Sequence, residues 1–212
     1  MPETTQDCRK LILASVALCS IFTNPIWSLS QSPSLSQLVA TGQVDVGGHE
    51  VAYRVRHLPV SSFPDLPAPI AEELNSRGCL IPQTYQAHRP ENVIHGSLEY
   101  AGSRDWAALC AAGGQVSLLI FFGSSSANNP IVMDKYAETD RLQKHDPSGE
   151  LGFNWGIDAA TPQRLHDALA GTPRRPAPLD HDSLADSILE SKTIYHMYRN
   201  GEWERVVVDQ TL

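Results

Sequence analysis

Arg77-Gly78-Cys79-Leu80-Ile81-Pro82-Gln83 and Asp105-Trp106-Ala107-Ala108-Leu109-Cys110 are the stretches around which the chain is organised. They bracket a segment of strand-like composition, and an apolar run from Val116 to Phe122 follows it closely. Because this run is apolar at successive positions, it predicts a central strand that is covered on both faces. The rest of the chain is expected to assemble around that strand.

Residues 1–30 have the features of a cleaved signal peptide. Arg9-Lys10 precedes an apolar run from Leu11 to Phe22, which is shorter than the roughly 20 residues of a membrane-spanning helix. Ser28-Leu29-Ser30 places small residues at the two positions that a signal peptidase reads, which predicts cleavage after Ser30. The alternatives are an uncleaved anchor and a lipid attached to Cys19. The chain is therefore expected to be periplasmic or secreted, without a stable membrane span.

Removal of residues 1–30 leaves Cys79 and Cys110 as the cysteines of the mature chain. Two cysteines of an exported protein have one intramolecular pairing available. Closing a loop of this length stabilises the fold by roughly 3–4 kcal/mol in the chain-entropy model. The alternative is a pair of buried free thiols. The sequence predicts the Cys79–Cys110 disulfide.

Strands are predicted where apolar and polar residues alternate or where a short apolar run lies between turn signals. Gly47-Gly48 and Asn200-Gly201 each separate two such runs, which predicts two hairpins. Three strands in the middle of the chain are expected to form an antiparallel meander. The predicted strands are 43–46, 49–56, 92–100, 105–110, 116–122, 194–198 and 203–208.

Helices are predicted from proline and capping residues. The first begins near Pro67 or Pro69, with Asp65 as its cap, and ends at Arg77 before Gly78. The second runs from Thr161-Pro162 to Gly171, and the third is capped by Asp180 or Asp182 and carries the apolar residues Leu184, Ala185, Ile188 and Leu189. Together the elements predict one α+β domain over residues 31–212, with an antiparallel sheet of about seven strands, about three helices and one disulfide.

The charge balance argues against a nucleic-acid partner. The net charge is −8, and a phosphate backbone requires a basic face. Hydrophobic residues make up 42% of the chain and charged residues 19%, which is typical of a folded domain rather than a disordered one.

No catalytic, cofactor-binding or metal site is predicted. The pairs His145-Asp146, His166-Asp167 and His181-Asp182 share no spacing, and they indicate surface and capping polarity rather than metal ligands. The run Gly123-Ser124-Ser125-Ser126 follows a strand but lacks the Gly-x-Ser-x-Gly pattern of a nucleophile elbow, so it is expected to be a loop. The sequence also lacks the glycine patterns that bind phosphates.

The two opening stretches, together with Asn92-Val93-Ile94 and the terminal Gly201-x-Trp203, form a combination that covers most of the mature chain. This combination resembles a family of small exported bacterial proteins without an assigned function. The resemblance implies secretion and a shared fold, and it brings no activity and no site.

The preferred function is a non-enzymatic envelope or secreted protein that binds or inhibits another macromolecule. The expected partner is another envelope or extracellular protein, or a glycan. The alternative is a hydrolase that acts on cell-wall or extracellular material. Exposure of Trp155, Tyr85 or Trp203 would favour the binding protein. A pocket histidine with a perturbed pKa, beside Ser, Asp or Glu, would favour the hydrolase.

Overall fold

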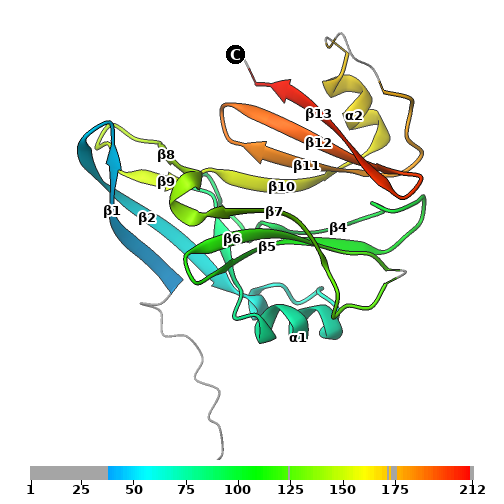
Figure 1. Ribbon diagram of the computed structural model, residues 1–212, viewed down its shortest axis with the longest axis horizontal. Helices are drawn as coiled ribbons and strands as arrows, with labels where there is room; N and C mark the ends of the chain where they lie inside the picture. Colours follow the sequence, from blue (N-terminus) through cyan, green and yellow to red (C-terminus); the bar gives the residue numbers. More distant parts are fainter. Residues whose placement is uncertain (1–37, 124, 171, 173–175, 211–212) are drawn as a thin grey trace, which may run out of the picture. The chain divides into compact units, whose positions relative to one another are not determined.

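A computed structural model describes residues 38–123, 125–170, 172 and 176–210. These residues belong to one compact unit, residues 33–212. The predicted signal peptide, its cleavage site and Cys19 lie outside the described residues. Within the part of the chain that is described, the protein is mostly β, with two sheets and two α-helices (Figure 1).

The larger sheet contains nine strands of the described chain. Its order is β7-β6-β5-β3-β2-β9-β8, with β1 paired to β2 and β4 paired to β5. Its strand pairs are antiparallel except for β2 and β9, which run parallel. The strands are β1 (Val39–Val46), β2 (His49–Pro59), β3 (Leu80–Gln83), β4 (Val93–Gly96), β5 (Asp105–Ala112), β6 (Gln115–Phe121), β7 (Ile131–Ala137), β8 (Leu142–Lys144) and β9 (Leu151–Phe153).

The smaller sheet is an antiparallel meander of four strands. They are β10 (Trp155–Ala160), β11 (Ser183–Ile188), β12 (Lys192–Arg199) and β13 (Glu202–Asp209), in this order. Among the described residues, the α-helices are α1 (Ala68–Ser76) and α2 (Pro162–Ala168), and the short 3₁₀ helices include η2 (Val60–Ser62) and η3 (Glu138–Arg141).

Three apolar cores order these elements into layers. One core lies between the two sheets, a second between the larger sheet and α1, and a third between the smaller sheet and α2. In Figure 1, α1 therefore lies below the larger sheet and α2 above the smaller one. The inter-sheet core is made by Val55, Leu98, Ala107, Leu109, Ala111, Val116, Leu118, Ile120, Phe122, Phe153, Trp155, Ile157 and Leu184.

Both predicted hairpins are confirmed. Gly47 and Gly48 join β1 to β2, and both have positive φ, 63° and 86°. Asn200 and Gly201 join β12 to β13 with φ of 52° and 86°. A tight turn that demands left-handed backbone favours asparagine and glycine, so the two dipeptides specify their turns locally. The meander of β4, β5 and β6 is confirmed as well.

The first two predicted helices are confirmed, with corrections at their ends. The predicted cap Asp65 does not cap α1, because Pro67 occupies the N-cap position without a side-chain hydrogen bond. Thr161 caps α2 as expected, since its side chain accepts a hydrogen bond from the Arg164 amide. Gly171, the predicted end of this helix, lies outside the described residues.

The predicted third helix is wrong. Residues 183–188 form β11, which pairs with β10 on one side and β12 on the other. Leu184 faces the larger sheet, whereas Ala185 faces α2, as alternation along a strand requires. Asp182 accepts a hydrogen bond from the Ser97 amide at 3.0 Å instead of capping a helix. Pairing on both edges overrides the weak helix propensity of this segment.

The single sheet of about seven strands is replaced by two sheets. The strands that sequence patterns did not predict include β3, β8 and β9, which have only three or four residues each. Such short segments show too few alternations to identify a strand. The sequence of strand β7 does not distinguish a short helix from a strand, and pairing with β6 determines that it is a strand.

The predicted disulfide is confirmed. Cys79, in the turn after α1, is bonded to Cys110 on β5. Both cysteines lie in the core between α1 and the larger sheet, so the bond fastens the end of the helix to a central strand. Neither helix in the described residues has the length and apolar composition that crossing a membrane requires.

Candidate functional site

Two adjoining hollows open on the α1 side of the larger sheet. Their volumes are about 540 Å³ and about 490 Å³, and both are lined by Asp65, His95 and Trp106. These volumes lie within the range of known ligand pockets. We call the two hollows together the Trp106 trough, because the Trp106 ring belongs to both. Its other lining residues are Ser62, Phe63, Pro64, Leu66, Pro67, Pro69, Ile70, Pro90, Val93, Arg104, Phe121, Phe122, Gly123, Ser125 and Ala127.

The two rings at the centre of the trough come from paired strands. His95 on β4 lies directly opposite Trp106 on β5, and their ring centroids are 4.9 Å apart. Alternation along β5 decides which way Trp106 faces. Its neighbour Ala107 lies in the inter-sheet core, so Trp106 projects to the α1 side, where it is only half-buried.

Prolines form much of the wall of the trough. Pro64 and Pro67 belong to the connection that leads into α1, Pro69 lies in the first turn of α1, and Pro90 precedes β4. Proline fixes φ, so a wall built from it loses little conformational freedom when a ligand binds. The sequence gave no sign that these prolines face Trp106.

The far end of the trough is held by the buried carboxylate of Asp105. Its Oδ1 accepts a hydrogen bond from the Gly123 amide at 2.8 Å, and its Oδ2 accepts one from the Leu98 amide at 2.7 Å. A side chain at Gly123 would place a Cβ 2.7 Å from the Arg104 carbonyl oxygen, so only glycine fits. The Asp105 carboxylate therefore joins the loop after β6 to the loop before β5.

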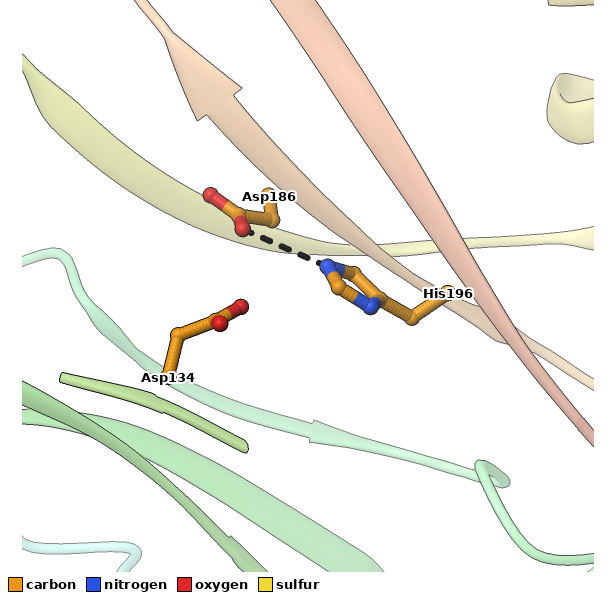
Figure 2. Close-up of side chains that lie close together, drawn as sticks. All are labelled: Asp134, Asp186 and His196. Carbon is orange, nitrogen blue, oxygen red and sulfur yellow. Dashed lines mark hydrogen bonds and ion pairs between the residues drawn. The ribbon is translucent and has the colours of Figure 1, made fainter. Parts of the chain in front are cut away.

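A second cluster of polar side chains lies on the opposite face of the larger sheet. Asp134 on β7, Asp186 on β11 and His196 on β12 have ligand atoms that all lie within 4.8 Å of one another. Figure 2 shows the Asp134 carboxylate directed at the other two side chains. The His196 ring is fully buried and Asp186 is 4% exposed. We call these three residues the inter-sheet cluster.

The inter-sheet cluster contains none of the histidines that precede an aspartate in the sequence. His145 and His166 are exposed. His181 is buried, and its Nδ1 lies 2.8 Å from Asp180 rather than contacting Asp182. That hydrogen bond lowers the pKa of Asp180. Asp134 and Asp186 are 52 positions apart in the chain, and Asp186 and His196 are 10 apart. Their spacing therefore does not indicate a metal site. Asp186 lies on a segment predicted as a helix, so its position beside His196 could not be inferred from the sequence either.

The tryptophans and the tyrosine expected on an exposed patch do not form one. Trp155 is fully buried between the sheets. Trp203 is half-buried and stacks on Phe122, with ring centroids 5.9 Å apart. Tyr85 is half-buried and stacks on His145 at 4.8 Å. The tryptophan that lines a hollow is instead Trp106.

We expect Tyr85→Phe to flatten the alkaline limb of the stability profile. Burial, followed by the negative charge of Glu190, raises the pKa of Tyr85. The unfolded value is about 10. Stability from the neutral phenol is therefore present below about pH 10 and is lost as the pH rises through the folded pKa. Urea unfolding at about pH 9 and 11 measures the loss. An equal loss of stability between these pH values in Tyr85→Phe and in the wild type would contradict this expectation. Tyr100→Phe is the control, because Tyr100 is exposed.

The chain matches no known protein family, no curated protein and no solved structure. The family resemblance drawn from the two cysteine-bearing stretches and from Gly201-x-Trp203 therefore stays a prediction.

Proposed function

We propose that this protein is an exported, non-enzymatic binding or inhibitory protein that holds an extended segment of another envelope or extracellular protein in the Trp106 trough. The observation that carries the proposal is the half-buried Trp106 ring, which belongs to two adjoining hollows at once. Tryptophan is the residue type most enriched among the side chains that dominate binding energy at protein interfaces.

The form of the trough suits a polymer better than a small molecule. The two hollows are open, and they share the ridge made by Asp65, His95 and Trp106. An extended peptide that crosses this ridge places side chains in both hollows, as in other grooves that recognise extended segments. A small ligand would be buried in only one hollow and would leave Trp106 partly uncovered.

The chemistry of the walls favours a peptide over a glycan. Apolar side chains predominate, among them Phe63, Ile70 and Phe121, and they complement apolar side chains of a partner. Asp65 on the shared ridge and Arg104 in one hollow supply opposite charges. Charges arranged in this way fix the direction and register of a bound segment more than they add affinity.

The disulfide supports the proposed location. Cys79 and Cys110 are bonded, and such bonds persist in oxidising compartments such as the periplasm and the extracellular space. The proposal therefore places the protein in the periplasm or outside the cell, with its signal peptide removed after Ser30.

A hydrolase is less well supported. His95 lines the same hollow as Asp65 and Ser125, which are residue types that a hydrolase uses. Nucleophilic catalysis requires the base and the nucleophile within hydrogen-bond reach of each other. Across the described ranges, no hydrogen bond joins His95 to either side chain.

We expect Trp106→Ala to weaken partner binding by about 30-fold, or about 2 kcal/mol, which is typical of a central anchoring residue. A photoreactive amino acid at position 95 would first capture the partner from intact cells. The purified partner would then be titrated against the wild type and the variant. Tyr100→Ala is the matched control, because Tyr100 is 54% exposed and is absent from the trough lining.

Three outcomes would contradict the proposal. If Trp106→Ala changes the affinity for the purified partner no more than Tyr100→Ala does, the trough is not the binding site. Capture of a glycan instead of a protein would show that the proposed class of partner is wrong. Turnover of a cell-wall or extracellular substrate by the purified protein, with loss of turnover in His95→Ala, would establish the hydrolase instead.

A further inference from the structure

We propose that Asp134, Asp186 and His196 bind a divalent transition-metal ion, best suited to Zn²⁺, that joins the larger sheet to the smaller one. Asp134 comes from the larger sheet, whereas Asp186 and His196 come from the smaller sheet. The three side chains meet between the layers (Figure 2). The site lies on the opposite face of the larger sheet from the Trp106 trough and is independent of it.

The smaller sheet presents its two ligands by alternation. Asp186 lies two residues after Leu184 on β11, and His196 is the residue paired with Leu184 on β12. Leu184 belongs to the inter-sheet core. Both polar side chains therefore face the larger sheet, because residues two apart or directly paired project from the same face.

A β-bulge brings the third ligand to the same place. Asp134 pairs with Leu118 and Val132 pairs with Leu119, so Met133 is the extra residue on β7. Leu118 belongs to the inter-sheet core, and Asp134 opposite it faces the same way. Bulges of this kind re-aim side chains and are common beside functional sites.

The distance between His196 and Asp186 is close to the distance between two ligand atoms of one metal ion. Nε2 of His196 lies 3.3 Å from Oδ2 of Asp186. A hydrogen bond between charged partners is normally about 2.7–2.9 Å long. Two donor atoms bound to one tetrahedral Zn²⁺ at about 2.1 Å lie about 3.4 Å apart. The observed distance is long for a charged hydrogen bond and close to that between two ligands of Zn²⁺.

The hydrogen bonds of the cluster are incomplete. Nδ1 of His196 is buried and has no partner among the described residues. The Asp134 carboxylate accepts no hydrogen bond from any described residue. Its cationic partner is Nη2 of Arg205 at 3.8 Å. That guanidinium is half exposed, so it offsets little of the negative charge. The two carboxylates therefore have little compensating positive charge from the described residues, and a cation bound between them and Nε2 of His196 would supply it.

The surroundings provide the support that a metal ligand requires. The indole Nε1 of Trp155 donates to Oδ1 of Asp186 at 2.5 Å, which leaves Oδ2 on the side of His196. Such outer contacts fix the orientation of a ligating carboxylate. Asp134 is partly exposed, so an ion can enter from this rim of the cluster.

The ligand set decides the class of ion. One imidazole and two carboxylates are ligands that Zn²⁺ accepts, and three protein ligands leave its fourth position to water. Ca²⁺ takes six to eight oxygen ligands, and Mg²⁺ needs near-ideal octahedral geometry. This compact mixed cluster supplies neither arrangement. Cu²⁺ binds most nitrogen and oxygen sites more tightly than Zn²⁺ does, so the tests use Zn²⁺ alone, with copper removed by a chelator beforehand.

The test titrates Zn²⁺ into the chelator-treated protein and follows it by native mass spectrometry and calorimetry. We expect one ion per wild-type chain, and an affinity more than about tenfold weaker in Asp134→Asn. Zn²⁺ at a concentration that just saturates the wild type should raise the melting temperature of the wild type more than that of the variant. Asp134→Asn is chosen because its partly exposed side chain lies at the rim, so the fold should survive the change.

Matched controls separate this site from surface binding. His166→Gln removes an exposed histidine, and Asp140→Asn removes an exposed carboxylate. Both should bind Zn²⁺ within about twofold of the wild type. The proposal is overturned if the wild type binds no Zn²⁺, if Asp134→Asn binds as tightly as the wild type, or if His166→Gln removes the tightest site. An equal rise in melting temperature with Zn²⁺ in the wild type and in Asp134→Asn would also overturn it, leaving a purely electrostatic cluster.

Discussion

Replacement of Asn92 by alanine is expected to lower the free energy of unfolding by about 4 kcal/mol. Asn92 is 1% exposed. Its Nδ2 donates to the carbonyl oxygens of Pro82, at 2.7 Å, and Trp155, at 3.2 Å. Its Oδ1 accepts from the Ile157 amide at 3.0 Å. This one side chain therefore connects β3 of the larger sheet to β10 of the smaller sheet.

Two effects add up in Asn92→Ala. Buried backbone groups lose their partners, at about 1–3 kcal/mol for each unsatisfied group. The backbone at position 92 also has φ of 69°, which asparagine tolerates better than alanine does. Asn200 has a similar φ of 52° but lies in an exposed turn, so Asn200→Ala measures the backbone effect alone.

Urea unfolding followed by tryptophan fluorescence measures both variants. Asn92→Gly should be less destabilised than Asn92→Ala, because glycine accepts positive φ, but it should still lose the hydrogen bonds. If Asn92→Ala costs no more than Asn200→Ala, the three hydrogen bonds contribute nothing to stability and the connection between the sheets lies elsewhere.

Removal of the disulfide by Cys79→Ser with Cys110→Ser is expected to cost about 3–4 kcal/mol. The bond closes a loop with a sequence separation of 31 residues, and without it the unfolded chain gains conformational freedom. Both cysteines are buried against α1, so the cost includes placing two hydroxyls in an apolar core.

Reduction of the wild type provides the matched experiment. A thiol reductant should lower the denaturation midpoint of the wild type and leave that of the double variant unchanged. Alkylation before reduction should label neither cysteine in the folded wild type. A wild-type midpoint that is insensitive to reductant, once mass spectrometry shows that the thiols are free, would contradict the expected contribution.

The features that the sequence predicts well are those that neighbouring residues specify. Gly47-Gly48 and Asn200-Gly201 determine their turns through their own backbone preferences, and both hairpins are present. Thr161-Pro162 likewise starts α2. The Cys79–Cys110 bond follows from a choice among very few pairings.

Features that depend on distant partners were missed. Residues 183–188 carry a helix-like pattern, but β10 and β12 on either side make them a strand. Asp134 reaches the inter-sheet cluster only because of the bulge at Met133, and no local pattern predicts that irregularity. Trp106 was noted in the sequence, yet its place in a trough depends on where α1 and its preceding prolines lie.

The parallel pair in the larger sheet has a consequence for the order of folding. One edge of β2 is occupied by β1, while the opposite edge is divided between β3 and β9. Tyr53 on β2 pairs with Leu151 on β9, so this contact must close almost half of the chain into a loop. The smaller sheet, in contrast, is built from successive strands.

Contacts between residues far apart in sequence form slowly. We therefore expect the smaller sheet to assemble early and the larger sheet to remain incomplete until residues 151–153 have joined β2. During synthesis from the amino terminus, part of the β2 edge stays unpaired while two thirds of the chain have already emerged. An unpaired edge is a template for association with a second chain, so we expect the nascent protein to associate during this delay unless dilution or a chaperone protects the strand.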